Sequence, residues 1–184
     1  KGFFDEEALD VEIRDVATWE PDVPFDLVFA RFLLSHLPDP ASLLAALFRH
    51  LRPHGLIVVE DIDFRGHFAE PDCPAVERFV ALYSAAVRRR GADPNIGPKL
   101  PALLRHAGFE DVQMTLVQHT AFLGGNKLLT YLTMENIADA VVADGIAPRE
   151  EVETIIDELH AFAHDPQVLH GGPRVFQAWG RRGA

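Results

Sequence analysis

A run of acidic residues that ends near a histidine is the first place where side chains suited to catalysis gather. Glu60, Asp61 and Asp63 close an apolar stretch, and His67 follows four residues after Asp63. Carboxylates that lie close together raise one another's pKa, which suits a general base. Asp63 and His67 are therefore the candidate catalytic residues, and the location of Glu60 and Asp61 at the end of a predicted strand favours contact with a substrate.

Two other interpretations of this run stay open. Asp61-x-Asp63-x-x-x-His67 also offers the oxygen and nitrogen ligands of a metal site. Alternatively, successive residues of a strand point to opposite faces, so that the carboxylates never form one cluster. We predict no metal here.

Three further reactive side chains are predicted to be structural or exposed. His160 and His164 have the i, i+4 spacing of helical metal ligands, but no third ligand is nearby. Cys73 is the only cysteine, which excludes an internal disulfide and suits a reducing compartment. No base adjoins Cys73, so we expect it to be structural.

Composition excludes several classes of protein. A chain of 184 residues with 48% hydrophobic content can form one core, and it contains no run of eighteen apolar residues that would predict a transmembrane helix. Lys1–Glu6 does not resemble a signal peptide, so we expect a cytoplasmic protein. The formal charge of −11 disfavours polyanionic partners. Arg88–Arg90 ends a predicted helix, where cations favour the helix dipole. We expect neither a nucleic acid nor a membrane as partner.

The elements that position these side chains begin with a strand, a helix and a strand. Phe25–Ala30 is typical of a short buried strand, and Leu56–Val59 of a second. Between them, Asp39 and Pro40 fit the N-cap and first position of an amphipathic helix that should end at Gly55. Such a unit places parallel strands in a sheet covered by helices. The fold class is therefore α/β.

Further elements lie on both sides of that unit. Val11–Arg14 alternates apolar and polar residues, as a half-exposed strand does. Beyond the unit, apolar spacing predicts helices over 76–87, 100–106, 127–143 and 148–163, and strands over 112–116 and 174–179.

The stretch Phe25–Phe64 resembles the middle of class I methyltransferases that use S-adenosylmethionine (SAM). In that family, a strand beginning Phe-Asp-Leu-Val precedes a loop with His-Leu and Asp-Pro, a helix, a Leu-Arg-Pro-x-Gly turn and an apolar strand ending in acids. All of these occur here in that order. Ala107–Val112 looks like the start of the family's sixth strand, and Val175–Gly180 looks like its seventh. The shared order makes the resemblance specific over most of the chain.

The resemblance implies a Rossmann-like sheet with strand order three, two, one, four, five, seven, six. Residues 1–184 would form one partial domain, with a helical cap at about 126–165 inserted before the last strand. If Val11–Arg14 is the third strand, the first and second strands would precede Lys1. The chain would then be a truncated gene product or a piece whose N-terminal part is not represented, and its sheet would be incomplete on that side.

The resemblance also implies where the cofactor SAM would lie. Asp15 would accept a hydrogen bond from the adenine amine, and the backbone amide of Val16 would contact the ring. Ala30, Arg31 and His36 would line the methionine part, because ligands of open α/β sheets sit outside the carboxyl ends of the strands. The alternatives are a solvated turn for Asp15 and a packing role for His36.

One feature of the family is missing. The family holds SAM with an acidic-x-Gly-x-Gly-x-Gly loop after its first strand, where glycines let the backbone approach the ligand. No Gly-x-Gly occurs in the 184 residues, and the pairs Gly124-Gly125 and Gly171-Gly172 follow the wrong strands. We therefore expect the chain by itself to be inactive.

The function implied by the resemblance is a methyl transfer from SAM to a small-molecule acceptor, in the complete form of the protein. Alignment and desolvation do most of the work in such a displacement, and Asp63 or His67 is needed as a base only if the acceptor loses a proton. The sequence does not specify the acceptor.

The alternative is a non-catalytic, methyltransferase-like module that binds a partner or itself. Without the first and second strands, Phe25–Ala30 would be an exposed apolar edge. Either Val11–Arg14 folds back beside it, or two chains meet there as a homodimer, which we favour.

Overall fold

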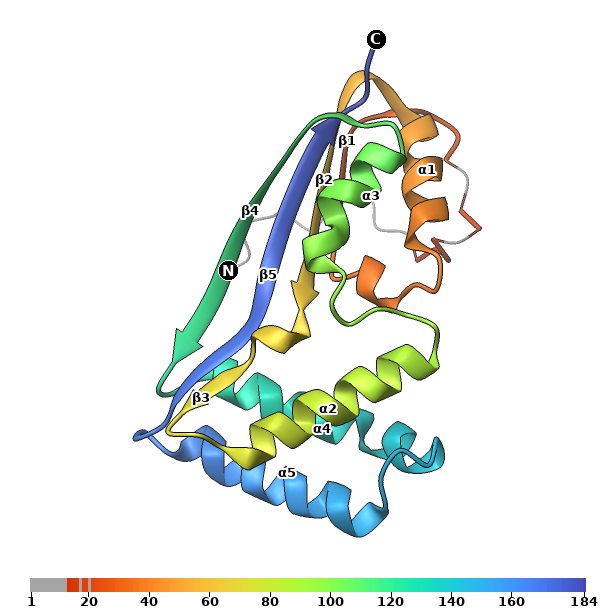
Figure 1. Cartoon of the computed structure of the whole chain (residues 1–184). Helices are drawn as coiled ribbons and strands as arrows, with labels where there is room; N and C mark the ends of the chain where they lie inside the picture. The colour runs from red at the N-terminus through yellow and green to blue at the C-terminus, as the bar shows by residue number, and fades with distance from the viewer. Residues whose placement is uncertain (1–12, 17, 20) are drawn as a thin grey trace, which may run out of the picture.

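A five-stranded mixed sheet organises the protein, as Figure 1 shows for the computed structural model, which describes residues 13–16, 18, 19 and 21–184. β1 runs parallel to β2, and the last strand lies antiparallel to β2, β3 and β4. The order β1-β2-β5-β4 agrees with the order four, five, seven, six that the resemblance implied. The strands are β1 (Phe25–Arg31), β2 (Leu51–Asp63), β3 (Phe68–Glu70), β4 (Glu110–Ala121) and β5 (Leu169–Arg181).

Helices α1 (Pro40–His50) and α3 (Leu100–His106) cover one face of this sheet (Figure 1). α1 begins as predicted, since Asp39 caps it by accepting from the backbone N–H of Ser42 at 3.0 Å. The strands and both helices share a core whose fully buried members are Leu44, Ile57, Val59, Leu100, Leu104 and Ala178.

Three longer helices pack together beyond the carboxyl end of β2 (Figure 1): α2 (Pro74–Arg89), α4 (Gly125–Ala143) and α5 (Arg149–His164). Their shared core is separate from the first and includes Phe79, Met134, Val141, Ile155 and Leu159. We call α4 and α5 the cap. The cap packs on α2 more than on the sheet.

A buried lysine ties the two ends of the cap together. Lys127, which is fully buried, donates from Nζ to the carbonyl oxygens of Phe122 (3.2 Å), Asp165 (2.6 Å) and Val168 (3.0 Å). Its ammonium also lies 4.5 Å from the ring centroid of Phe162. Burial lowers the pKa of Lys127. The segment before α4 and the segment after α5 are thereby both hydrogen-bonded to the ammonium of Lys127.

The predicted end of the first helix at Gly55 was wrong. α1 ends at His50, and Leu51 already pairs with Phe25. The next pair is Leu27 with Leu56, so the intervening residues bulge out of the strand, and His54 has a φ of 63°. The expected turn exists, but it lies within β2, because Leu51 joins the core before the turn begins.

The structure describes only the second half of the predicted strand Val11–Arg14, and that half is not a strand. Val11 and Glu12 lie outside the described residues, and Ile13 and Arg14 are not in a strand. Ile13 is 98% exposed. The short strand β3 (Phe68–Glu70), which pairs with Leu169–Gly171, was not predicted.

β1 ends the sheet, since its only partner strand within the described ranges is β2. Leu27 and Phe29 on this strand are 55% and 56% exposed. Among the described residues, no helix is both long enough and apolar enough to cross a membrane.

Candidate functional site

A cavity of about 650 Å³ lies between the carboxyl ends of β1 and β2, helix α2 and the cap helix α4. Strand register explains how four of its polar residues meet. Arg31 pairs with Glu60, Glu60 with Gln177, and Gln177 with Thr115, so one row across four strands points to one face. The other lining residues are Phe32, Ser35, His36, Ile62, Phe64, His67, Phe79, Tyr83, Val117, His119, Leu129, Thr130, Thr133, Gly172, Pro173 and Val175.

The charged members of this row neutralise one another. Arg31 Nε donates to Glu60 Oε1 over 2.6 Å, and Gln177 Nε2 donates to Glu60 Oε2 over 3.0 Å. Both carboxylate oxygens of Glu60 are therefore engaged. Arg31 also lies over the ring of Phe32, with its guanidinium carbon 4.7 Å from the centroid. This wall of the cavity consequently presents an ion pair rather than a free charge.

An aromatic wall faces the same cavity from α2 and the turn after β2. The rings of Phe64 and Tyr83 are stacked, with centroids 3.9 Å apart and planes 13° apart. Phe79 lies 5.4 Å from Phe64. All three are buried. Burial, and then the charge of Asp61, raise the pKa of Tyr83, so its hydroxyl stays protonated at neutral pH.

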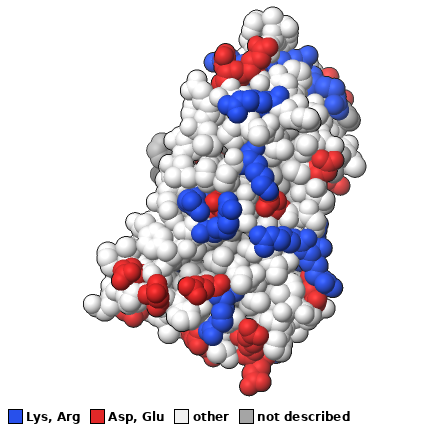
Figure 2. Space-filling model, in the orientation of Figure 1, with Lys and Arg blue, Asp and Glu red and all other residues white. Residues whose placement is uncertain are grey.

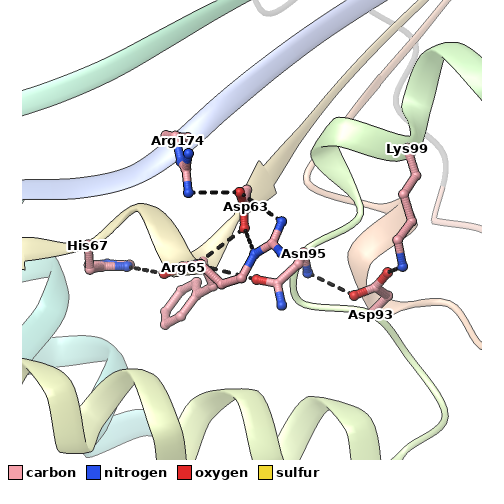
Figure 3. Close-up of polar contacts among 8 residues, drawn as sticks. Asp63, Arg65, His67, Asp93, Asn95, Lys99 and Arg174 are labelled. Carbon is pink, nitrogen blue, oxygen red and sulfur yellow. Dashed lines mark hydrogen bonds and ion pairs between the residues drawn. The ribbon is translucent and has the colours of Figure 1, made fainter.

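His67 lines the cavity with its tautomer set by the backbone. Its Nδ1 lies 2.8 Å from the carbonyl oxygen of Phe64 (Figure 3), so Nδ1 carries the proton and Nε2 is left as an acceptor. Burial lowers the pKa of His67 to about 4, which keeps the ring neutral. His170 lies behind it, with ring centroids 5.6 Å apart. Burial, then His67 and Lys127, lower the pKa of His170 to about 4 as well.

Asp63 and Asp61 are turned away from this cavity. Asp63 accepts from Arg65 Nε at 2.7 Å and forms an ion pair with Arg174 at 3.1 Å (Figure 3). Asp61 is fully buried and accepts from the backbone N–H of Ser35 at 3.0 Å. Neither aspartate lines the cavity, whereas Glu60, on the opposite face of β2, does. The structure thus separates the acidic residues that are adjacent in sequence.

The candidate metal ligands are also dispersed. Within the described ranges, no group of three or more His, Cys, Asp or Glu side chains is arranged to hold a metal ion. The rings of His160 and His164 lie 4.6 Å apart on α5, and His164 Nδ1 lies 2.8 Å from the carbonyl oxygen of His160. Cys73 is a free, half-buried thiol before α2.

The residues expected to contact SAM fit that cofactor in part. Arg31 and His36 line the cavity, and Ala30 is buried beneath it. Asp15 is exposed in a turn where its carbonyl oxygen accepts from the Thr18 N–H at 3.1 Å, and Val16 packs against the core that contains Ala30. Two of the five residues that the resemblance assigned to SAM therefore reach the cavity. The glycine loop of the family occurs nowhere in the 184 residues.

Several residues that line the cavity were not predicted from the sequence as site residues. Phe79 and Tyr83 were predicted on the apolar face of a helix, but nothing showed that this face meets a cavity. Thr115 and Gln177 break the apolar pattern of their strands, which was a usable signal. Thr133 comes from α4, whose placement depends on tertiary packing.

Comparison with known proteins identifies the family. The family model described as "Methyltransferase domain" matches residues 3–114. Three relatives are named trans-aconitate 2-methyltransferase. The one from Methylobacterium radiotolerans is 33% identical over 102 residues, which cover 54% of this chain and 36% of the relative. The one from Rhizobium leguminosarum bv. trifolii is 28% identical over 179 residues, which cover 88% of this chain and 66% of the relative.

A solved structure supports the fold. A putative methyltransferase from Bacillus halodurans superposes with a TM-score of 0.51 and 16% identity, over 93% of this chain and 70% of that one. The chain spans less than two thirds of the curated relatives named above. With a family model matching more than half of its length, the chain belongs to the class I SAM-dependent methyltransferase family.

Proposed function

We propose that this chain carries the acceptor-binding part of a SAM-dependent methyltransferase that acts on a small molecule. The observation that carries the proposal is the cavity at the carboxyl ends of β1 and β2, which the cap helix α4 helps to enclose. Ligands of open α/β sheets bind at this edge. Family membership makes methyl transfer the chemistry expected there.

SAM would supply an electrophilic methyl group, whose bond to sulfur breaks as the bond to the acceptor forms, with sulfur keeping the electron pair. The chain's own residues would hold one side of it. Asp15 and Val16 are proposed to face the adenine, and Ala30, Arg31 and His36 the methionine part. Their shared location beside the end of β1 supports this assignment for Arg31 and His36 in particular.

The acceptor would lie against the aromatic wall, where the cavity excludes water and aligns the reacting atoms. His67 is the better candidate base, because its Nε2 is an acceptor and its ring lines the cavity. Asp63, held by Arg65 and Arg174, is the weaker one. Glu60 is positioned to contact substrate. Asp61 would act only indirectly, by fixing the short 3-10 helix Leu34–His36 through Ser35.

Transfer of radiolabelled methyl groups from SAM to small-molecule acceptors tests the proposal. It should be assayed with the 184 residues alone and with any residues encoded upstream of Lys1 included. Activity should require a Gly-x-Gly-x-Gly segment upstream, and the 184 residues alone should bind SAM no tighter than millimolar by calorimetry. Micromolar binding of SAM by the chain alone would show that the glycine loop is dispensable. A true initiator codon near Lys1, together with no methyl transfer, would remove the catalytic proposal.

The second candidate is a non-catalytic module that associates with itself. The observation that favours it is the outer edge of β1, which pairs with no second strand among the described residues, with Leu27 and Phe29 exposed. Exposed apolar edges promote pairing between chains.

A further inference from the structure

The charges around the cavity restrict what it can bind. Of its twenty lining residues, Arg31 is the only Lys or Arg and Glu60 the only Asp or Glu. These two are paired with each other at 2.6 Å. His67 is kept neutral by burial, and His36 and His119 are exposed at the rim. The described walls therefore offer no unpaired fixed cation to a ligand.

Nearby cations are engaged elsewhere. Figure 2 shows Lys and Arg side chains gathered across the middle of one face of the molecule. Within the described part of the chain, Arg65 and Arg174 both bind Asp63, and Lys99 binds Asp93. Arg65 and Arg174 share the single carboxylate of Asp63 (Figure 3), and none of these three cations lines the cavity.

The apolar walls, in contrast, are incompletely covered. Val117, Leu129 and Phe32 line the cavity and are 50%, 61% and 38% exposed. Opposite them stand the stacked rings of Phe64 and Tyr83. A ligand with a flat apolar surface would cover the exposed parts of Val117, Leu129 and Phe32, at roughly 25 cal/mol for each Å² removed from water. A polycarboxylate would lose hydration without gaining a partner, which is unfavourable.

We propose, building on the proposed function, that the acceptor bound here is an uncharged, largely apolar molecule with an aromatic ring and a polar group such as a hydroxyl. This differs from a polycarboxylate such as trans-aconitate, after which three relatives are named. The ring packs against the Phe64–Tyr83 wall. The hydroxyl is placed among the polar residues of the cavity, of which His67 offers an acceptor nitrogen.

Two probes of similar availability separate the alternatives: 2-naphthol, which is uncharged at pH 7, and trans-aconitate, which is anionic. Their binding to the 184-residue chain is measured by calorimetry. The expected result is that 2-naphthol binds at least about tenfold more tightly. Thr133→Trp, which fills the cavity from α4, should abolish that binding. The matched control is Leu132→Trp, because Leu132 is 48% exposed and does not line the cavity.

A second pair of variants covers the case in which Thr133→Trp does not fold. Val117→Arg adds an unpaired cation to the wall and should shift the preference toward trans-aconitate by about tenfold. Leu116→Arg, on the opposite face of β4 and outside the cavity, should not. The opposite result is that the unmodified chain binds trans-aconitate more tightly than 2-naphthol, with that binding lost in Thr133→Trp or altered only in Val117→Arg. This result overturns the inference about the acceptor but leaves the proposed function. If neither probe shows binding that changes in Thr133→Trp or in Val117→Arg, both this inference and the proposed function are overturned.

Discussion

Arg31 and Glu60 are register partners across the parallel strands β1 and β2, and their side chains join over 2.6 Å at the mouth of the cavity. Gln177 on β5 holds the second oxygen of Glu60. Three strands thereby fix one ion pair, and the pair, rather than either charge alone, is what the cavity presents.

Removing the carboxylate should expose the charge of Arg31. In Glu60→Gln, we expect trans-aconitate to bind about five- to tenfold more tightly, because Arg31 loses its counter-ion beside the cavity. Calorimetry measures the change. Glu158→Gln, which breaks the surface ion pair between α5 and Arg78 on α2, is the control and should leave the affinity unaltered. Equal affinities in both variants would mean that Arg31 does not face the ligand.

The cap is predicted to be mobile relative to the sheet. The hydrogen bonds of Lys127 are expected to limit this motion. Hydrogen exchange over 127–163 should be faster than over Leu56–Val59, since cap lids gate access to sites of this kind. Lys127→Met leaves three carbonyls without their donor and should accelerate exchange in α4 and α5 further. Lys99→Met, which removes only a surface pair with Asp93, should not. Exchange in the cap as slow as in Leu56–Val59 would show a rigid cap.

Acid should destabilise the fold through two buried histidines. Burial lowers the pKa values of His67 and His170 from the usual 6.5 to about 4. Between these pH values the unfolded chain binds protons that the folded chain excludes, so stability falls as pH drops from 6.5 toward 4. Each histidine contributes about 1–2 kcal/mol of loss between pH 7 and pH 5.

Urea unfolding at pH 7 and pH 5 checks this expectation. His170→Leu should flatten the pH dependence, because both ring nitrogens of His170 are buried without a hydrogen-bond partner among the described residues. His106→Asn, at an exposed position on α3, should retain the full slope. An unchanged slope in His170→Leu would place the acid sensitivity elsewhere.

The open edge of β1 should make the chain self-associate. We expect sedimentation to show a concentration-dependent dimer, and the double variant Leu27→Lys with Phe29→Lys to remain monomeric, since charges on an edge strand oppose pairing. Leu123→Lys changes an equally exposed side chain outside β1 and should still dimerise. A stable monomer of the unmodified chain at every concentration would contradict the role assigned to this edge.

Elements governed by local patterns were predicted well. Asp39 and Pro40 located the start of α1, because a cap and a first-turn proline act within a few residues. The end of that helix was misplaced at Gly55, because the packing of Leu51 against both helix and sheet is not local.

The site was predicted only where it follows a strand end. Of the acidic run and its neighbouring histidine, Glu60 and His67 line the cavity. Asp61 and Asp63 do not, because the alternation along β2 turns them to the other face, which was the alternative interpretation from sequence. Thr130 and Thr133 could not be predicted from the sequence. The packing of the cap against α2 determines which face of α4 lines the cavity.

The central claim is that the cavity between the sheet and the cap is where the acceptor binds. Its most direct test is NMR of the methyl groups of the chain during titration with 2-naphthol. We expect shift changes at Val117, Leu129 and Val175, which line the cavity, and none at Leu27, on the outer strand. Changes at Leu27 with the cavity methyls unaltered would contradict it.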